Sequence, residues 1–368
     1  MISAIVSHHF SGTYVEARNK FLTAASDRGA TIESFPLPGY RGALDEELAI
    51  DVACLGARDA SRLLILSSGT HGPEGFCGSG CQVAALHDDD LLGLLERSGI
   101  RLVMIHGINP YGFSHIQRNN QDNVDLNRNH IDFAKPLPAN PAYAVVDPLA
   151  LPATWPPTQD DDRAMAAYLE QYGVSAYHAA LASGQYHQPD GMFYGGREPT
   201  WNNRTVRTIL RRYCTGAQHI GWIDVHTGLG PNGHGEKIYA GRVSTADLAI
   251  ARSWWGADVF APFEGQSESP EVSGPVVSTV YDECPQAAVG LIALEIGTLP
   301  FQEILFHLRA SQWLVRHPEL PASVQRDIRR RLLDAYYCDN DAWKGAVWAQ
   351  ARTALVQALS GLAKASLA

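Results

Sequence analysis

Two side chains that bind zinc well stand three residues apart in this sequence, just after an apolar run. The run Arg-Leu-Leu-Ile-Leu-Ser at 62–67 predicts a buried strand, and His71 and Glu74 follow it among glycines and a proline. A catalytic zinc ion takes three protein ligands, usually imidazole or carboxylate groups, and leaves one position open. His226 ends a second apolar run and completes a His₂Glu set. The three residues predict a zinc site, although His71 and Glu74 alone would also fit ordinary turn chemistry.

A carboxylate in an unusual place provides a candidate for the base that a zinc hydrolase needs. Glu295 follows the apolar run Gly-Leu-Ile-Ala-Leu at 290–294. Burying an unpaired charge there would be costly. An ion pair in the core would explain the residue, but a base that faces a metal-activated water is our preferred interpretation.

A polar stretch after the apolar run at 101–108 adds two arginines and an amide. Arg118, Asn127 and Arg128 stand there among asparagines and turn residues. The planar guanidinium group suits carboxylates, and it can also stabilise an oxyanion. We therefore expect this stretch to recognise an anionic substrate group, with a hydrogen-bonded surface loop as the structural alternative.

The elements that must position these residues follow an α/β pattern. Helical patterns cover 13–29, 45–57, 78–97, 162–183, 200–214, 244–257, 301–317, 322–336 and 341–363. Strand-like runs cover 31–35, 62–68, 101–108, 219–226, 236–241, 276–283 and 288–297. Their alternation predicts a three-layer α/β/α fold with a mixed, mostly parallel central sheet. Ligands of such sheets bind beyond the carboxyl ends of the strands, where His71, His226 and Glu295 are expected.

Length and composition restrict the class of protein. The 368 residues carry a net charge of -10, which argues against a nucleic-acid partner. No apolar run approaches the roughly 20 residues of a membrane helix, so no membrane association is expected. The first 21 residues lack the features of a signal peptide, which favours a cytoplasmic protein. We expect a single domain over 1–368 with a large loop and helix insertion at about 133–200, since that stretch begins Pro-rich and the sheet pattern resumes after it.

Five separated motifs resemble the zinc carboxypeptidases of the carboxypeptidase A type. They are His-x-x-Glu at 71–74, Asn-Pro-Tyr-Gly at 109–112, Asp-Leu-Asn-Arg-Asn at 125–129, His226 and Glu295, in the order of that family and over about residues 60–300. The segments at 14–25 and 184–196 look like a little-characterised bacterial branch of the superfamily. The resemblance implies a zinc carboxypeptidase-like (phosphorylase/hydrolase-like) fold.

The resemblance also implies a role for each motif residue. It implies one Zn²⁺ per chain on His71, Glu74 and His226. The other implied residues are Glu295 as general base and proton donor, Arg118 on the scissile carbonyl, Asn127 and Arg128 on the substrate carboxylate, and Asp125 as the partner of a zinc-bound histidine. Tyr281 is the nearest candidate for the tyrosine that caps the substrate, although its offset differs from that of the family. Further candidates for substrate contacts are His115, His187, Tyr194, Val277 and Ser278.

The function that follows is a zinc-dependent metallocarboxypeptidase, which hydrolyses a C-terminal peptide or amide bond with metal-activated water. Its substrate would be a peptide or acyl-amino acid with a free carboxylate. One alternative resembles aspartoacylase and succinylglutamate desuccinylase, and is a zinc deacylase or amidohydrolase of small N-acyl amino acids. An insertion that folds over the mouth of the site would favour it. A second alternative is a catalytically idle binding protein on the same fold, which the presence of every catalytic residue type disfavours.

Overall fold

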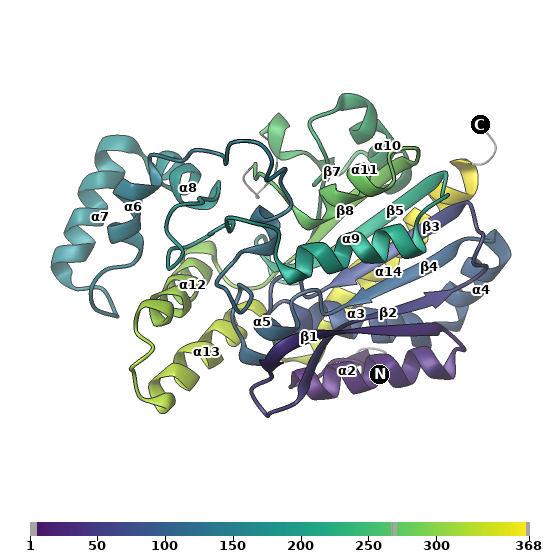
Figure 1. Cartoon of the computed structure of the whole chain (residues 1–368), viewed down its shortest axis with the longest axis horizontal. Coiled ribbons are helices and arrows are strands. Elements are labelled where there is room, and N and C mark those ends of the chain that lie inside the picture. Colours follow the sequence, from purple (N-terminus) through teal and green to yellow (C-terminus); the bar gives the residue numbers. More distant parts are fainter. Residues whose placement is uncertain (1–5, 266, 268–270, 366–368) are drawn as a thin grey trace.

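The centre of the protein is an eight-stranded mixed sheet with the strand order β1-β2-β4-β3-β5-β8-β6-β7 (Figure 1). The computed structural model describes residues 6–265, 267 and 271–365, so the first five residues of the stretch that favours a cytoplasmic location lie outside it. The strands are β1 Thr31–Arg41, β2 Glu47–Leu55, β3 Arg62–Ser68, β4 Arg101–His106, β5 His219–Gly228, β6 Gly235–Ile238, β7 Val259–Phe260 and β8 Ala288–Gly297. The four central strands, β4, β3, β5 and β8, are parallel. The pairs β1–β2, β2–β4 and β6–β8 are antiparallel, which confirms the predicted mixed sheet.

Helices cover both faces of this sheet. The helices of one face are α2 Tyr14–Asp27, α3 Gly75–His87, α4 Asp89–Ser98, α10 Thr245–Trp255 and α14 Asp341–Ala365, and those of the other are α9 Trp201–Tyr213 and α11 Thr279–Glu283. Successive side chains of a strand point to opposite faces. In β3, Leu64 and Leu66 accordingly join the first apolar layer, whereas Leu63 and Ile65 join the second. The predicted α/β/α fold is therefore confirmed.

A further group of helices lies beyond the sheet, at the left of Figure 1. Three of them come from the predicted insertion and are α6 Tyr143–Ala150, α7 Gln159–Tyr172 and α8 Val174–Ala182. They share an apolar cluster with α12 Phe301–Arg316 and α13 Ala322–Tyr336, in which Val146 and Leu181 accompany Ile304 and Leu332. None of the helices within the described ranges has the length and apolar character needed to cross a membrane.

Short segments complete the chain between these elements. They are the helix α5 Pro110–His115 and the 3₁₀ turns η1 Leu126–Arg128, η2 Pro262–Glu264 and η3 Val276–Ser278. Both α5 and η1 lie in the polar stretch that follows β4, and this places them beside the site described below.

Two predictions of secondary structure are wrong. Residues 45–57 were expected to be helical, but Glu47–Leu55 is the strand β2, buried between β1 and β4. An apolar run that is buried on both faces has no alternating pattern, so periodicity cannot distinguish it from a helix. The expected strand at 276–283 is instead η3 followed by α11. β6 already pairs with the outer edge of β8, which leaves no edge there for another strand.

Candidate active site

The parallel strands bring three distant parts of the sequence to one edge of the sheet. β3, β5 and β8 lie side by side, with Ser68 opposite Val225 and His226 opposite Glu295. The turn after β3 carries His71 and Glu74 to the same edge. Ligand atoms of His71, Glu74 and His226 all lie within 4.8 Å of one another, and all three residues are buried. The fold thus assembles the His₂Glu set.

A close contact between two loops fixes the turn that carries His71 and Glu74. Gly72 lies against the loop after β4, so closely that a Cβ there would stand 2.1 Å from the carbonyl carbon of Gly112. Its N–H donates to the carbonyl oxygen of Arg118 at 3.3 Å. The side chain of Asn109 donates to the same oxygen at 3.1 Å. The Asn-Pro-Tyr-Gly motif therefore positions Arg118 next to the candidate metal ligands.

The two histidines are oriented alike. Nδ1 of His71 lies 3.0 Å from Glu74 Oε1, and Nδ1 of His226 lies 2.7 Å from Glu74 Oε2. Their Nε2 atoms lie 3.1 Å from Asp125 Oδ1 and 2.7 Å from Asp224 Oδ2. An imidazole whose Nε2–H donates to a carboxylate presents the lone pair of Nδ1 to a metal ion. Both rings turn that nitrogen toward Glu74, so the donor set and its outer partners fit a zinc ion.

Asp224 was not among the predicted site residues. It stands two residues before His226 in β5, hence on the same face of the strand, and that spacing was the available signal. The hydroxyl groups of Ser67 and Thr70 donate to its two oxygens at 2.6 Å and 2.9 Å. The carboxylate is therefore held rigidly behind His226.

The electrostatics of this centre favour a cation. Burial opposes a charge on His226, but Asp224 and Glu74 outweigh burial and raise the pKa of that imidazole well above its usual value. Burial likewise opposes ionisation of Asp125, yet the charges of Arg118 and His71 hold the pKa of Asp125 well below the usual range. Without a metal ion, a proton on His226 offsets the negative charge of these carboxylates. A divalent ion held by Glu74 and the two Nδ1 atoms would offset that negative charge instead.

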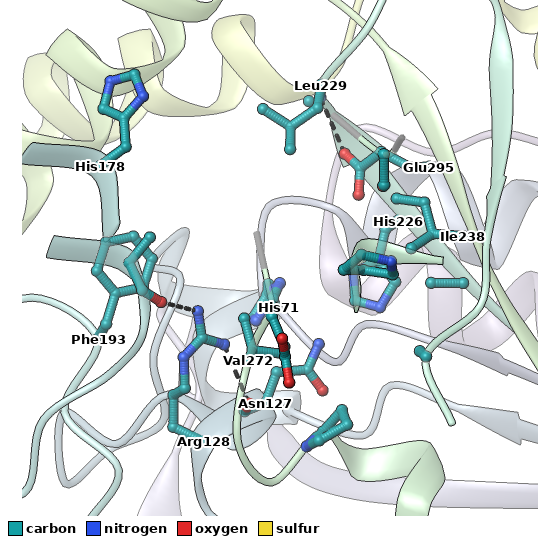
Figure 2. Close-up of a pocket in the computed structure, with 18 of the residues that line it drawn as sticks. His71, Asn127, Arg128, His178, Phe193, His226, Leu229, Ile238, Val272 and Glu295 are labelled. Atoms are coloured by element: carbon teal, nitrogen blue, oxygen red, sulfur yellow. Dashed lines mark hydrogen bonds between the residues drawn. The ribbon is translucent and has the colours of Figure 1, made fainter. Parts of the chain in front are cut away.

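Glu295 faces the same cavity as the candidate ligands, and its environment suits a base. Its Oε1 accepts the N–H of Leu229 at 2.9 Å (Figure 2). Burial, reinforced by the charge of Glu74, raises the pKa of Glu295 to about 7. A general base is most effective when its pKa lies near the operating pH. Glu295 can therefore accept and release a proton at neutral pH.

Arg118 lies between Asp125 and a tyrosine that the sequence did not reveal. Its Nε donates to Asp125 Oδ2 at 3.1 Å, and Nη1 lies 3.4 Å from Glu74 Oε1. Tyr336, at the end of α13, lines the cavity beside this guanidinium. Burial raises the pKa of Tyr336 above its usual value, which keeps the phenol protonated as a hydrogen-bond donor. Nothing in the sequence around Tyr336 connects it to the strand ends.

Tyr281, the predicted capping tyrosine, does not line this cavity. Its hydroxyl oxygen lies 3.3 Å from that of Tyr239, and its ring lies 4.6 Å from the guanidinium carbon of Arg242. Tyr239 and Arg242 both line the cavity, so Tyr281 stands behind the wall rather than in it. The structure brings Tyr336, and not Tyr281, next to Arg118 and Glu295.

Asn127 and Arg128 lie on the opposite side of the ligand set from Glu295 (Figure 2). Arg128 is only 3% exposed, and its Nη atoms donate to the carbonyl oxygens of Asn127 at 3.0 Å and Ala182 at 2.5 Å. Its Nε–H has no acceptor in the part of the chain that the structure describes. The side-chain oxygen of Asn127 accepts the N–H of Val276 at 2.9 Å. Arg128 lines the cavity, and a guanidinium group in a cavity wall is suited to an anionic ligand group.

A strained aromatic residue lies against both arginines. The ring of Phe193 lies 5.3 Å from the guanidinium carbon of Arg118 and 5.4 Å from that of Arg128. Its φ of 52° is unfavourable for a bulky side chain, and such backbone strain gathers at functional sites. Two sequence candidates from the same segment as Phe193 have a different position. His187 and Tyr194 do not line the cavity, although the carbonyl oxygen of Tyr194 accepts the N–H of Asp125 at 2.8 Å.

The candidate metal ligands, Glu295, both arginines and Tyr336 line one cavity of about 800 Å³. The predicted residues that line it are His71, Glu74, Arg118, Asn127, Arg128, His226, Ser278 and Glu295. Asp125 lies behind His71, and neither His115 nor Val277 contributes to the lining. The volume is in the range of pockets that hold a small organic ligand, about 300–1,000 Å³. The arrangement therefore combines three candidate metal ligands, a candidate base and two arginines in one cavity.

Residues 10–350 match the model of a family described as "Protein of unknown function (DUF2817)", so the chain belongs to that family. A comparison of the sequence with curated proteins finds no match.

Several solved structures are similar to this chain. Carboxypeptidase A from Helicoverpa armigera is 14% identical, with a TM-score of 0.46 over 88% of this chain and 74% of that one. A metallo-carboxypeptidase from Pseudomonas aeruginosa is 12% identical, with a TM-score of 0.41 over 93% of this chain and 68% of that one. An aspartoacylase family protein from Mesorhizobium loti is 14% identical, with a TM-score of 0.35 over 78% and 66%. These names belong to the two groups that the sequence motifs resemble, but at such identities and scores an activity does not transfer.

Proposed function

We propose that this protein is a zinc-dependent hydrolase of the carboxypeptidase type, which cleaves the amide bond before an amino acid with a free carboxylate. The observation that carries the proposal is the joint presence of His71, Glu74, His226 and Glu295 in one cavity with the pair Asn127 and Arg128. A structural ion pair would not need all of them to converge on one open space. The idle-protein alternative is disfavoured because no component of the site is missing.

Each residue has a task in the proposed reaction. A zinc ion held by His71, Glu74 and His226 would act as a Lewis acid and would lower the pKa of a water molecule. Glu295 accepts the proton of the attacking water and delivers it to the leaving nitrogen. Arg118 and the phenol of Tyr336 donate hydrogen bonds to the carbonyl oxygen as negative charge develops on it. Asp125 and Asp224 keep the two imidazoles in one orientation.

Recognition of a carboxylate is tested by amidating it. If Asn127 and Arg128 bind the free carboxylate of the substrate, its amide should be hydrolysed at least about 30-fold more slowly in kcat/KM. This is the lower end of the roughly 2–5 kcal/mol that a buried charge pair contributes. In an Arg128→Ala variant the free and amidated substrates should react at similar, slow rates. Equal rates in the wild type would remove the carboxypeptidase assignment and leave a metal hydrolase of another kind.

The deacylase alternative is favoured by one specific observation. The insertion supplies α8 and Phe193 to the cavity wall, so it forms part of the site. Peptides and N-acyl amino acids share the amide bond and the carboxylate, and therefore the same catalytic residues. Rates on dipeptides and on N-acyl amino acids with the same C-terminal residue distinguish the two candidates.

Phe193 provides a further test, because its ring lies against both arginines and it is not itself a candidate metal ligand. Phe193→Ala should remove two cation–π contacts of about 0.5–2 kcal/mol each. We expect a rise in KM of roughly tenfold for carboxylate substrates, with the zinc content unchanged. Phe193→Tyr keeps the ring and should restore most of the affinity. Phe306→Ala removes an aromatic ring of α12 that does not line the cavity, and serves as control. Unchanged kinetics in Phe193→Ala would show that the ring only fills space.

A further inference from the structure

Two helices form one side of the cavity, each with a single face. The residues that α8 contributes include Ser175, His178, Ala179 and Ala182, and those of α12 are Phe301, Ile304, Leu305 and Leu308. Both sets recur at intervals of three or four residues, so each set lies along one face of its helix. The rings of His178 and Phe301 meet edge to face, with centroids 4.7 Å apart, and join the two helices. We call these eight residues the α8–α12 wall.

The α8–α12 wall is neutral and largely apolar. None of the eight side chains is an acid, a lysine or an arginine. Burial lowers the pKa of His178, which disfavours a charge on this imidazole. Phe301 is 37% exposed and lies at the rim of the wall, whereas Ile304 and Leu308 are buried. The charged groups of the cavity lie outside these eight residues, although one of them, Arg128, donates to the carbonyl oxygen of Ala182 at the end of the wall.

The position of the α8–α12 wall relates it to the acyl half of the substrate. α8 ends at Ala182, whose carbonyl oxygen accepts a hydrogen bond from Arg128. From that end the helix runs back to His178, whose ring contacts Phe301. α12 shares its apolar cluster with α13, which places Tyr336 beside Arg118.

Asn127 is bonded to η3, in a different part of the cavity. In Figure 2, His178 and Leu229 lie above His71, and Asn127 lies below it. A substrate with its carboxylate at Asn127 and Arg128 and its carbonyl at Arg118 has room for its acyl group along α8, on the side of the cavity where His178 lies.

We propose that the α8–α12 wall binds a large apolar acyl group, and that the substrate is an N-acyl amino acid with an alkyl or aryl chain. The inference rests on the proposed amide hydrolysis and narrows its substrate class. An acetyl group is too small to cover the wall, and a succinyl group would bring a charge to it. A peptide would bury amide groups beside a surface whose only polar side chains are Ser175 and His178. In the reaction the C–N bond breaks, the acyl carbon gains OH from water to give a carboxylic acid, and the nitrogen gains H to give the amino acid.

The substrate series that tests this inference holds the amino acid constant. N-acetyl-, N-butanoyl-, N-hexanoyl- and N-octanoylalanine differ only in the length of the acyl chain. Each buried methylene contributes about 0.8 kcal/mol, or roughly fourfold. We expect kcat/KM to rise with each step and to differ at least about 100-fold between acetyl and octanoyl. A flat or falling series, or a preference for alanyl-alanine over N-octanoylalanine, would overturn the inference.

Substitutions in α12 test whether the wall residues cause the preference for long acyl chains. Leu305→Gln places a polar group in the wall, and it should lower the ratio of the octanoyl rate to the acetyl rate at least about tenfold. Phe306→Gln is the matched control, because Phe306 is an exposed neighbour on the same helix whose ring contacts Trp155 outside the cavity. This control should leave the ratio unchanged. Phe301→Gln, at the exposed rim, gives the same test if Leu305→Gln does not fold. An unchanged ratio in both wall variants would contradict the assignment.

Binding to a variant that lacks the base separates this inference from the proposed function. Calorimetry of Glu295→Gln with N-acetylalanine and N-octanoylalanine needs no turnover. If affinity rises with chain length while the wild type hydrolyses neither compound, the wall is an acyl-binding site and the proposed reaction is wrong. If the wild type hydrolyses both compounds but neither rate nor affinity depends on chain length, the reaction stands and the inference fails. If the compounds are neither bound nor hydrolysed, both are wrong.

Discussion

Replacing both His71 and His226 with alanine should remove zinc from the protein and abolish hydrolysis of every amide substrate. The two imidazoles provide the Nδ1 atoms that face Glu74, and a single carboxylate does not retain a catalytic zinc ion. The wild type should hold about one zinc per chain by elemental analysis, and the double variant less than about a tenth of that. Dialysis against a chelator should inactivate the wild type, and zinc should restore it.

The control for this experiment removes two histidines that lie outside the cavity. His115 contacts the ring of Tyr111 and the carbonyl oxygen of Arg41, and His187 is exposed. His115→Ala/His187→Ala should therefore keep its zinc and its activity. Full occupancy in the His71→Ala/His226→Ala variant would place the metal elsewhere in the protein. A folded variant without zinc that still hydrolyses its substrate would rule out a metal-dependent reaction.

Glu295→Gln should leave a folded, zinc-loaded protein whose turnover is about 10²–10⁴-fold lower, the scale of general acid–base catalysis. Glutamine keeps the shape of the side chain, and its carbonyl oxygen can still accept the N–H of Leu229. It cannot accept the proton of an attacking water. The loss should therefore appear in kcat rather than in zinc content or in KM.

The pH profile gives this prediction a second measurement. Burial and the charge of Glu74 raise the pKa of Glu295 to about 7 in the metal-free protein, and a bound zinc ion would lower it again. A base must be ionised to act, so wild-type kcat should fall as the pH drops through the pKa of Glu295, at or below about 7. The residual activity of Glu295→Gln should lack that acid limb. Wild-type turnover in the variant would make Glu295 structural, and loss of zinc would make it a ligand.

The individual strand ends of the site could be predicted from the sequence. His71, His226 and Glu295 each follow or end an apolar run, and a polar residue at such a place is conspicuous because burying it is costly. Parallel strands end at one edge of a sheet, so their meeting follows from the α/β pattern alone. β2 could not be predicted in the same way. It is buried between two strands, and a fully buried run loses the alternation that identifies a strand.

Only the tertiary structure decided which other groups meet these strand ends. Tyr336 reaches Arg118 because α13 packs on α12, and Phe193 reaches both arginines through a backbone conformation that its residue type disfavours. Tyr281 was proposed from its nearness in sequence to β8, yet the fold turns it toward Tyr239. The sequence by itself determined the metal-binding residue types and the sheet edge that gathers them, since both follow from local apolar runs. The walls of the cavity depend on contacts between segments far apart in the chain, and no local pattern records those contacts.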